Sequence, residues 1–108
     1  MKIKVNGQMV EVDDNMVDII LMLNDKGYTT QFCCEGHVEN DILCVYVYFD
    51  KLYNFPSNPK GFKVKKWQNK TIIEYILTVD DSGQKALRKL DRLAQLKKWV
   101  NELPIREI

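Results

Sequence analysis

Residues 42–49 read ILCVYVYF, and this stretch, Ile42–Phe49, decides the fold that we predict. Every residue in it is apolar or aromatic, so a strand here is suited to burial on both faces. Such a strand is typical of the centre of a sheet, and the other elements are expected to pack around it. A shorter strand, Thr29–Cys34, precedes it and is broken by the turn Glu35–His37.

Two β-hairpins are predicted in the rest of the chain. The pair Asn6-Gly7 is the strongest two-residue hairpin signal, because both positions of a type I′ turn need a positive φ. It joins the expected strands Lys2–Val5 and Gln8–Val12. The second hairpin consists of Phe62–Trp67, the turn Gln68-Asn69 and Lys70–Thr78.

Two helices are also predicted. The first runs from Met16 to Asn24, after three residues with N-capping side chains, and Gly27 supplies its left-handed stop. Because this helix is apolar nearly all round, we expect it to be buried by the sheet and also by a second subunit. The second helix begins near residues 80–82 and ends before Pro104. Its expected core stripe is Ala86, Leu90, Leu93, Ala94, Val100 and Leu103.

The predicted order is ββαββββα, which makes residues 1–108 a single α+β domain with a mostly antiparallel sheet and two helices. A hydrophobic content of 45% and a charged content of 29% are those of an ordinary globular protein. No apolar run reaches the roughly 20 residues of a membrane span, and the first residues lack the apolar core of a signal peptide. Three cysteines, an odd number, do not suggest a disulfide framework, so a cytoplasmic location is expected.

The chemically distinctive segment is CCEGH, Cys33–His37, and four interpretations of it remain open. In the first, both cysteines are small buried hydrophobic residues and His37 lies on the surface. In the second, Cys34, His37 and Cys44 bind a metal ion, with zinc as the fitting metal. Adjacent strand residues point to opposite faces, so Cys33 is not expected to join them.

The other two interpretations are catalytic and anion-binding. Cys34 is a candidate nucleophile with His37 as its base, although no third residue that would orient the pair is apparent. Alternatively, Gly36 lets a phosphate approach the backbone closely, successive amides form a nest for it, and His37 donates a hydrogen bond. The basic second half of the chain favours this anion site among the functional interpretations.

Charge is distributed unevenly along the chain. Residues 1–50 hold three basic and nine acidic side chains, whereas residues 51–108 hold thirteen basic and six acidic ones. Alternating lysines in the second hairpin and cations on the last helix, together with tryptophans, would suit a nucleotide or a single-stranded nucleic acid. The alternative is a solvated helix face and a charged edge strand, in a protein with a pI of about 7.7. The expected basic flank of the last helix is Lys85, Arg88, Arg92, Gln95 and Trp99.

The segment Leu23–His37 resembles a group of small bacterial and phage proteins that share a helix, a Gly-Tyr turn, a Thr-led strand and a Cys-x-Gly-His tip. It is also distantly similar to the helix, strand and turn of the tRNA wybutosine-synthesising methyltransferase family, in which an arginine stands at the place of His37. The resemblance implies a turn suited to the phosphate of a nucleotide or nucleic acid, in a protein encoded by a mobile element.

These observations predict a non-enzymatic protein that binds a phosphate-bearing ligand, a nucleotide or a nucleic acid, and the resemblance suggests a role in phage counter-defence. No cofactor is expected, with zinc as the one exception. Two alternatives remain: an enzyme that uses Cys34 and His37 on a nucleotide or tRNA, and a homo-oligomer that inhibits a host protein by direct contact. The candidate ligand-binding residues are Thr30, Gly36, His37, Lys63, Lys65, Arg88, Arg92 and Trp99.

Overall fold

The computed structural model describes residues 1–78 and 81–106, with the exception of the Ser82 side chain. This part of the chain forms six strands, one 3-10 turn and two α-helices in the predicted order ββαββββα, which confirms the α+β class. The elements are β1 (Lys2–Val5), β2 (Gln8–Glu11), η1 (Asp14–Met16), α1 (Val17–Asp25), β3 (Thr30–Cys34), β4 (Leu43–Phe49), β5 (Lys63–Trp67), β6 (Lys70–Leu77) and α2 (Ser82–Glu102).

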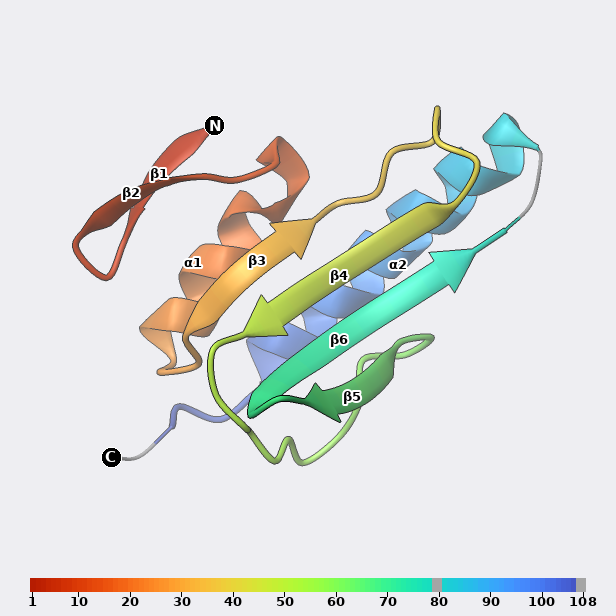
Figure 1. The fold of residues 1–108 in the computed structure, drawn as a ribbon. Helices are drawn as coiled ribbons and strands as arrows, with labels where there is room; N and C mark the ends of the chain where they lie inside the picture. The colour runs from red at the N-terminus through yellow and green to blue at the C-terminus, as the bar shows by residue number, and fades with distance from the viewer. Residues whose placement is uncertain (79–80, 107–108) are drawn as a thin grey trace.

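The strands form two separate antiparallel sheets in the described part of the chain (Figure 1). β1 and β2 make a hairpin, and β3, β4, β6 and β5 follow one another across a four-stranded sheet. β4 pairs along its full length with β6, from Leu43 opposite Leu77 to Phe49 opposite Thr71, and its other edge pairs with β3. The prediction that this strand lies inside the sheet is therefore confirmed.

Both hairpin turns have the backbone conformation that a two-residue hairpin requires. Asn6 and Gly7 have φ angles of 51° and 82°, and Gln68 and Asn69 have φ angles of 47° and 63°. Two consecutive positive φ angles match the right-handed twist of the flanking strands. Asn and Gly adopt this region at the lowest cost, which is why the first hairpin is so clear in the sequence.

Both α-helices lie on the same side of the four-stranded sheet, and α2 runs behind β4 and β6 in Figure 1. β4 therefore has two different faces, one fully buried against the helices and one half-buried. The fully buried face holds Leu43, Val45, Val47 and Phe49. The half-buried face holds Cys44, Tyr46 and Tyr48. Among the described elements, no helix covers the second face of the sheet.

The first helix, α1, contacts the β1–β2 hairpin, β3 and α2. Its residues Ile19, Ile20 and Leu23 are buried in the core, which Ile3 of the hairpin also joins. Leu21, by contrast, is 41% exposed, so the chain itself covers only part of this apolar helix. The contribution of a second subunit to its burial stays a prediction.

The long helix, α2, turns a different face to the core from the one that the sequence pattern predicted. Leu93, Val100 and Leu103 are buried as expected, but Leu90 is 67% exposed and Ala94 is exposed as well. The prediction was wrong at these two positions because its spacing drifted from the 3.6-residue period of a helix.

The buried flank of α2 instead includes two cations, Lys85 and Arg92, that the prediction had placed on the opposite flank, and also Lys89. Lys85 is buried and its Nζ donates to the Asn40 carbonyl (2.6 Å), while Lys89 and Arg92 are largely buried. Long basic side chains pack their aliphatic stems against apolar neighbours and carry their charge to a partner at the edge. A pattern that treats every lysine and arginine as exposed cannot find this face.

Candidate functional site

The segment Cys33–His37 leads out of β3 into the connection to β4. Gly36 is buried and has a φ angle of 88°, a conformation that favours glycine. A Cβ atom at this position would lie 2.7 Å from Leu43 Cδ1 and 3.1 Å from Val45 Cγ2. The turn therefore packs closely onto β4 because residue 36 has no side chain.

Cys34 and His37 lie close together at this turn, and Asp13 joins them from the residue before η1. One Sγ, one ring nitrogen and one carboxylate oxygen of these three residues lie within 4.8 Å of one another. The Asp13 Oδ2 atom is 3.9 Å from His37 Nε2 and accepts a hydrogen bond from the Glu35 amide (3.1 Å). Sequence reasoning found the pair but missed Asp13, whose position before a helix predicted only a capping role. Cys44, the third metal ligand that the sequence suggested, is not part of this group.

The environment of the two β3 cysteines, Cys33 and Cys34, does not favour a thiolate. Burial raises the pKa of the Cys33 thiol to about 11, and its side chain packs against the core, as in the first of the four interpretations. The pKa of Cys34 is also raised, first by burial and further by two nearby carboxylates. A hydrogen bond from the Gly36 amide to Cys34 Sγ (3.4 Å) acts in the opposite direction without reversing the shift. Activated cysteine nucleophiles need a cation or a positive helix end beside the sulfur, so the pairing with His37 lacks the electrostatics of a cysteine enzyme.

The same turn is poorly arranged for an anion. Two of its amides already donate to Asp13 and Cys34. The two ring nitrogens of His37 face carboxylates, with Nε2 3.9 Å from Asp13 and Nδ1 3.7 Å from Glu39. A phosphate next to Gly36 and His37 would therefore lie among negative charges, whereas a cation would be attracted.

Glu35, in the middle of the turn, has a structural role. Its Oε2 atom lies 3.0 Å from Lys89 Nζ and also accepts a hydrogen bond from Asn15 Nδ2. Burial by itself would raise the pKa of Glu35, but the Asn15 and Lys89 interactions outweigh it, and the pKa is lowered. The carboxylate thus joins the turn to η1 and to α2.

The chain was compared with protein-family models, with curated proteins and with solved structures. No match is found. The resemblance of Leu23–His37 to a family therefore stays a prediction from the sequence. Within residues 1–78 and 81–106, neither α-helix combines the length and the hydrophobicity that a membrane-spanning helix needs.

The helix residues that were predicted to contact a ligand do not share an exposed surface. Trp99 is 6% exposed, and its indole Nε1 donates to the Ser57 carbonyl (3.2 Å) and hydroxyl (3.0 Å). The Arg92 guanidinium lies 4.8 Å above the centre of the Tyr75 ring, and Arg88 remains exposed. The expected exposed flank was wrong for Trp99, because the buried face of α2 includes it.

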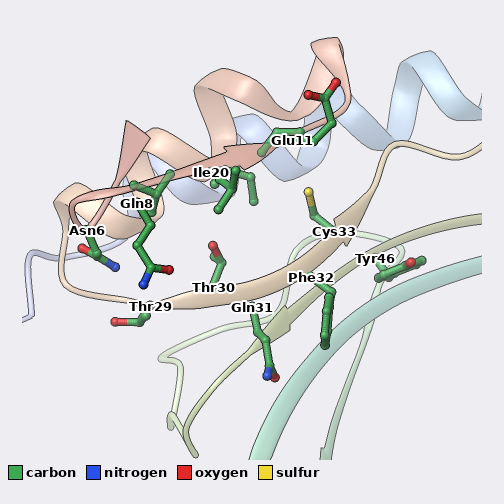
Figure 2. Close-up of a pocket in the computed structure, with 13 residues that line it drawn as sticks. Asn6, Gln8, Glu11, Ile20, Thr29, Thr30, Gln31, Phe32, Cys33 and Tyr46 are labelled. Carbon is green, nitrogen blue, oxygen red and sulfur yellow. The ribbon is translucent and has the colours of Figure 1, made fainter. Parts of the chain in front are cut away.

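A cleft of about 520 Å³ separates β2 from the outer edge of β3 (Figure 2). Thr30 and Cys33 point into this cleft, whereas Phe32 points away from it. The Thr30 hydroxyl accepts a hydrogen bond from Asn24 Nδ2 (2.9 Å), and the Thr30 amide donates to Asn24 Oδ1 (3.2 Å). Thr30 is therefore held by α1 and lies at the opposite end of β3 from the His37 turn.

The uncovered face of the four-stranded sheet brings aromatic and basic side chains together. Residues directly opposite each other in neighbouring strands project from the same face. We call this set the open face; it holds Phe32 and Cys34 of β3, Cys44, Tyr46 and Tyr48 of β4, Lys70, Ile72, Glu74 and Ile76 of β6, and Lys63, Lys65 and Trp67 of β5.

Three rings on the open face form one aromatic cluster. The centre of the Tyr48 ring is 6.3 Å from that of Phe32 and 5.1 Å from that of Tyr46, with the planes steeply inclined. Phe32 is 56% exposed, and Trp67 at the end of β5 is 58% exposed. Sequence reasoning did not assign the three clustered rings to a site. The available signal was the alternation of aromatic and aliphatic residues within ILCVYVYF.

The open face carries more positive than negative charge. Lys63 and Lys65 of β5 both lie on it, and Lys70 of β6 is the third lysine. Glu74 is the one acidic side chain that the four strands, all of them described, place on this face. Its carboxylate forms an ion pair with Lys65. Two of the predicted ligand residues, Lys63 and Lys65, thus share one face of the sheet with the aromatic cluster.

Proposed function

We propose that this protein binds single-stranded nucleic acid on the open face of its four-stranded sheet. The observation that carries the proposal is the juxtaposition of the Phe32, Tyr46 and Tyr48 rings with three lysines on one uncovered surface. Bases stack on exposed aromatic rings, and lysines attract the phosphates between them. The proposal agrees with the sequence-based expectation of a phosphate-bearing ligand, but it assigns the binding site to the sheet and not to the Gly36–His37 turn.

The positions of these groups suggest how a strand would lie. The aromatic cluster belongs to β3 and β4, whereas Lys63 and Lys65 stand on β5 at the opposite edge of the sheet. Bases would therefore stack over the β3–β4 half, and the sugar-phosphate backbone would run along the β5 half. Neighbouring strands are about 4.8 Å apart, so the face is wide enough for more than one nucleotide.

A second copy of the chain is the competing occupant, since uncovered sheet faces also mediate association. The excess of lysines favours nucleic acid, because two copies that met through this face would bring like charges together. An exposed Trp67 and an exposed Phe32 suit either occupant. The experiment therefore has to measure nucleic-acid binding and the oligomeric state together.

The test is fluorescence anisotropy with labelled single-stranded DNA, single-stranded RNA and duplex DNA. We expect single strands to bind more tightly than duplex, and Phe32→Ala to weaken binding by about 5- to 150-fold, the range for loss of one stacked base. Leu87→Ala is the matched control, because Leu87 is 70% exposed but lies on α2, behind the sheet. Equal affinity of Phe32→Ala and the wild type would contradict the proposal. A dimer in light scattering that Phe32→Ala dissociates would assign the face to a second copy.

A further inference from the structure

We propose that Asp13, Cys34 and His37 bind a divalent transition-metal ion, zinc above all. The three ligand atoms come from separate segments, the residue before η1, the end of β3 and the turn that follows, and lie within 4.8 Å of one another. Cys34 ends the edge strand β3 and belongs to the open face, but Asp13 and His37 lie outside the four strands that form it. The proposal does not depend on nucleic-acid binding. It keeps two ligands that the sequence suggested and replaces Cys44 with Asp13.

The spacing of the ligand atoms suits a tetrahedral ion. With Zn–S near 2.3 Å and Zn–N and Zn–O near 2.0 Å, neighbouring ligand atoms lie about 3.3–3.7 Å apart. The distance from His37 Nε2 to Asp13 Oδ2 is 3.9 Å in the structure. Small rotations of side chains that are not fully buried would bring the atoms to coordination distance.

The surroundings orient each ligand as in known metal sites. The Asp13 carboxylate accepts a hydrogen bond from the Glu35 amide (3.1 Å), and Cys34 Sγ accepts one from the Gly36 amide (3.4 Å). With Nε2 of His37 toward the ion, its Nδ1 faces the Glu39 carboxylate at 3.7 Å. A carboxylate behind a metal-bound imidazole fixes the ring and increases its basicity.

The charge of the site also calls for a cation. The ion displaces the proton of the Cys34 thiol, and the resulting thiolate and the Asp13 carboxylate carry two negative charges, which a divalent ion neutralises. The nearby cation Lys89 is already engaged by Glu35 at 3.0 Å. Sulfur and imidazole ligands select zinc over magnesium or calcium, which prefer oxygen.

Three protein ligands leave one tetrahedral position for solvent or another molecule. The side chains of His37 and Asp13 are 43% and 34% exposed, so this position is open to water. Structural zinc sites have four protein ligands, whereas sites with three protein ligands and one open position bind exchangeable molecules. We therefore assign the site to the second class.

The test is titration of the reduced full-length chain with Zn²⁺ by calorimetry and with Co²⁺ by absorbance. We expect one ion per chain and a thiolate-to-cobalt charge-transfer band. Cys34→Ser should abolish the band and weaken zinc binding by at least about 100-fold, and Asp13→Asn and His37→Ala should weaken it by at least about 10-fold. The controls are Cys44→Ser and Asp14→Asn, which make the same kinds of substitution at residues outside the proposed site. Both controls should still bind one ion per chain and show the charge-transfer band.

A second measurement needs no variant that could misfold. Zinc should slow alkylation of Cys34 in the wild-type chain, read by peptide mass spectrometry, and leave the rate at Cys44 unchanged. Absence of zinc binding, or an equal loss in Cys44→Ser and Cys34→Ser, would overturn the proposal. Oligonucleotide binding by Asp13→Asn, measured in parallel, separates failure of this site from failure of the open face, because Asp13 does not belong to that face.

Discussion

The Lys89 ammonium lies 3.0 Å from the Glu35 carboxylate and fastens the turn after β3 to the C-terminal helix. The two side chains are only 19% and 12% exposed. Asn15 of η1 donates to the same carboxylate, so three segments that are far apart in the sequence meet at one residue. This contact holds Cys34 and His37 in place relative to the rest of the fold.

We expect Lys89→Met to lower the free energy of unfolding by about 1–3 kcal/mol, because it leaves a largely buried carboxylate with one fewer partner. Urea unfolding followed by circular dichroism measures the change. In the double variant with Glu35→Gln, part of the loss should be recovered, since the unpaired charge is then gone. The matched control is Lys97→Met, whose ion pair with Asp18 (3.4 Å) has side chains 53% and 71% exposed. A loss in Lys97→Met as large as that in Lys89→Met would refute the special role of the buried pair.

Gly36→Ala should destabilise the fold much more than Gly7→Ala. Both glycines have positive φ angles, 88° and 82°, so both substitutions incur a backbone cost of about 1–2 kcal/mol. At Gly36 the new Cβ would also meet Leu43 Cδ1 at 2.7 Å, which adds about 1–3 kcal/mol of overpacking. A Cβ atom at Gly7 would have no atom within 4 Å beyond those of its chain neighbours. Thermal or urea unfolding of the two variants compares them directly, and equal losses would show that the contact with β4 is not tight.

Local signals were enough to predict the order of the elements. The Asn6-Gly7 turn needs no tertiary information, because its two positive φ angles belong to the hairpin itself. ILCVYVYF likewise identified an interior strand. It did not reveal that both helices lie on one side of the sheet, because nothing within a strand states which of its faces a distant helix will cover.

The candidate sites depended on contacts that a linear pattern does not contain. Asp13 and Cys34 are joined only when η1 packs beside the end of β3, so the sequence offered a Cys–His pair without its third member. On α2, the prediction placed Trp99 on an exposed flank because Trp99 shares its flank with the cations Lys85 and Arg92. That flank is in fact turned toward the core. Periodicity shows which residues share a helix face. It does not show which face is buried when cations on that face can pack their aliphatic stems against the core.

The two tryptophans should report different environments. Trp67 is 58% exposed and Trp99 is 6% exposed, so Trp67→Phe should leave a blue-shifted emission that resists acrylamide, and Trp99→Phe a red-shifted emission that is quenched. Trp99→Phe should also cost about 1–2 kcal/mol of stability, because it removes the hydrogen bonds from the indole to Ser57 and part of a buried ring. Oligonucleotide affinity should be unchanged in Trp99→Phe. A loss of affinity with intact folding would return Trp99 to the ligand site.

Binding to single-stranded nucleic acid should weaken with salt in proportion to the lysines of the open face. Each phosphate contact contributes about −0.7 to the slope of log affinity against log salt concentration, so Lys63, Lys65 and Lys70 predict a slope near −2. Lys63→Gln should make the slope shallower by about 0.7, and the exposed Lys98→Gln on α2 should leave it unchanged. Because the Glu74 carboxylate competes with phosphate for Lys65, Glu74→Gln should raise the affinity. Anisotropy titrations at a series of salt concentrations measure these changes. Equal slopes for Lys63→Gln and Lys98→Gln would mean that the phosphates lie elsewhere on the protein.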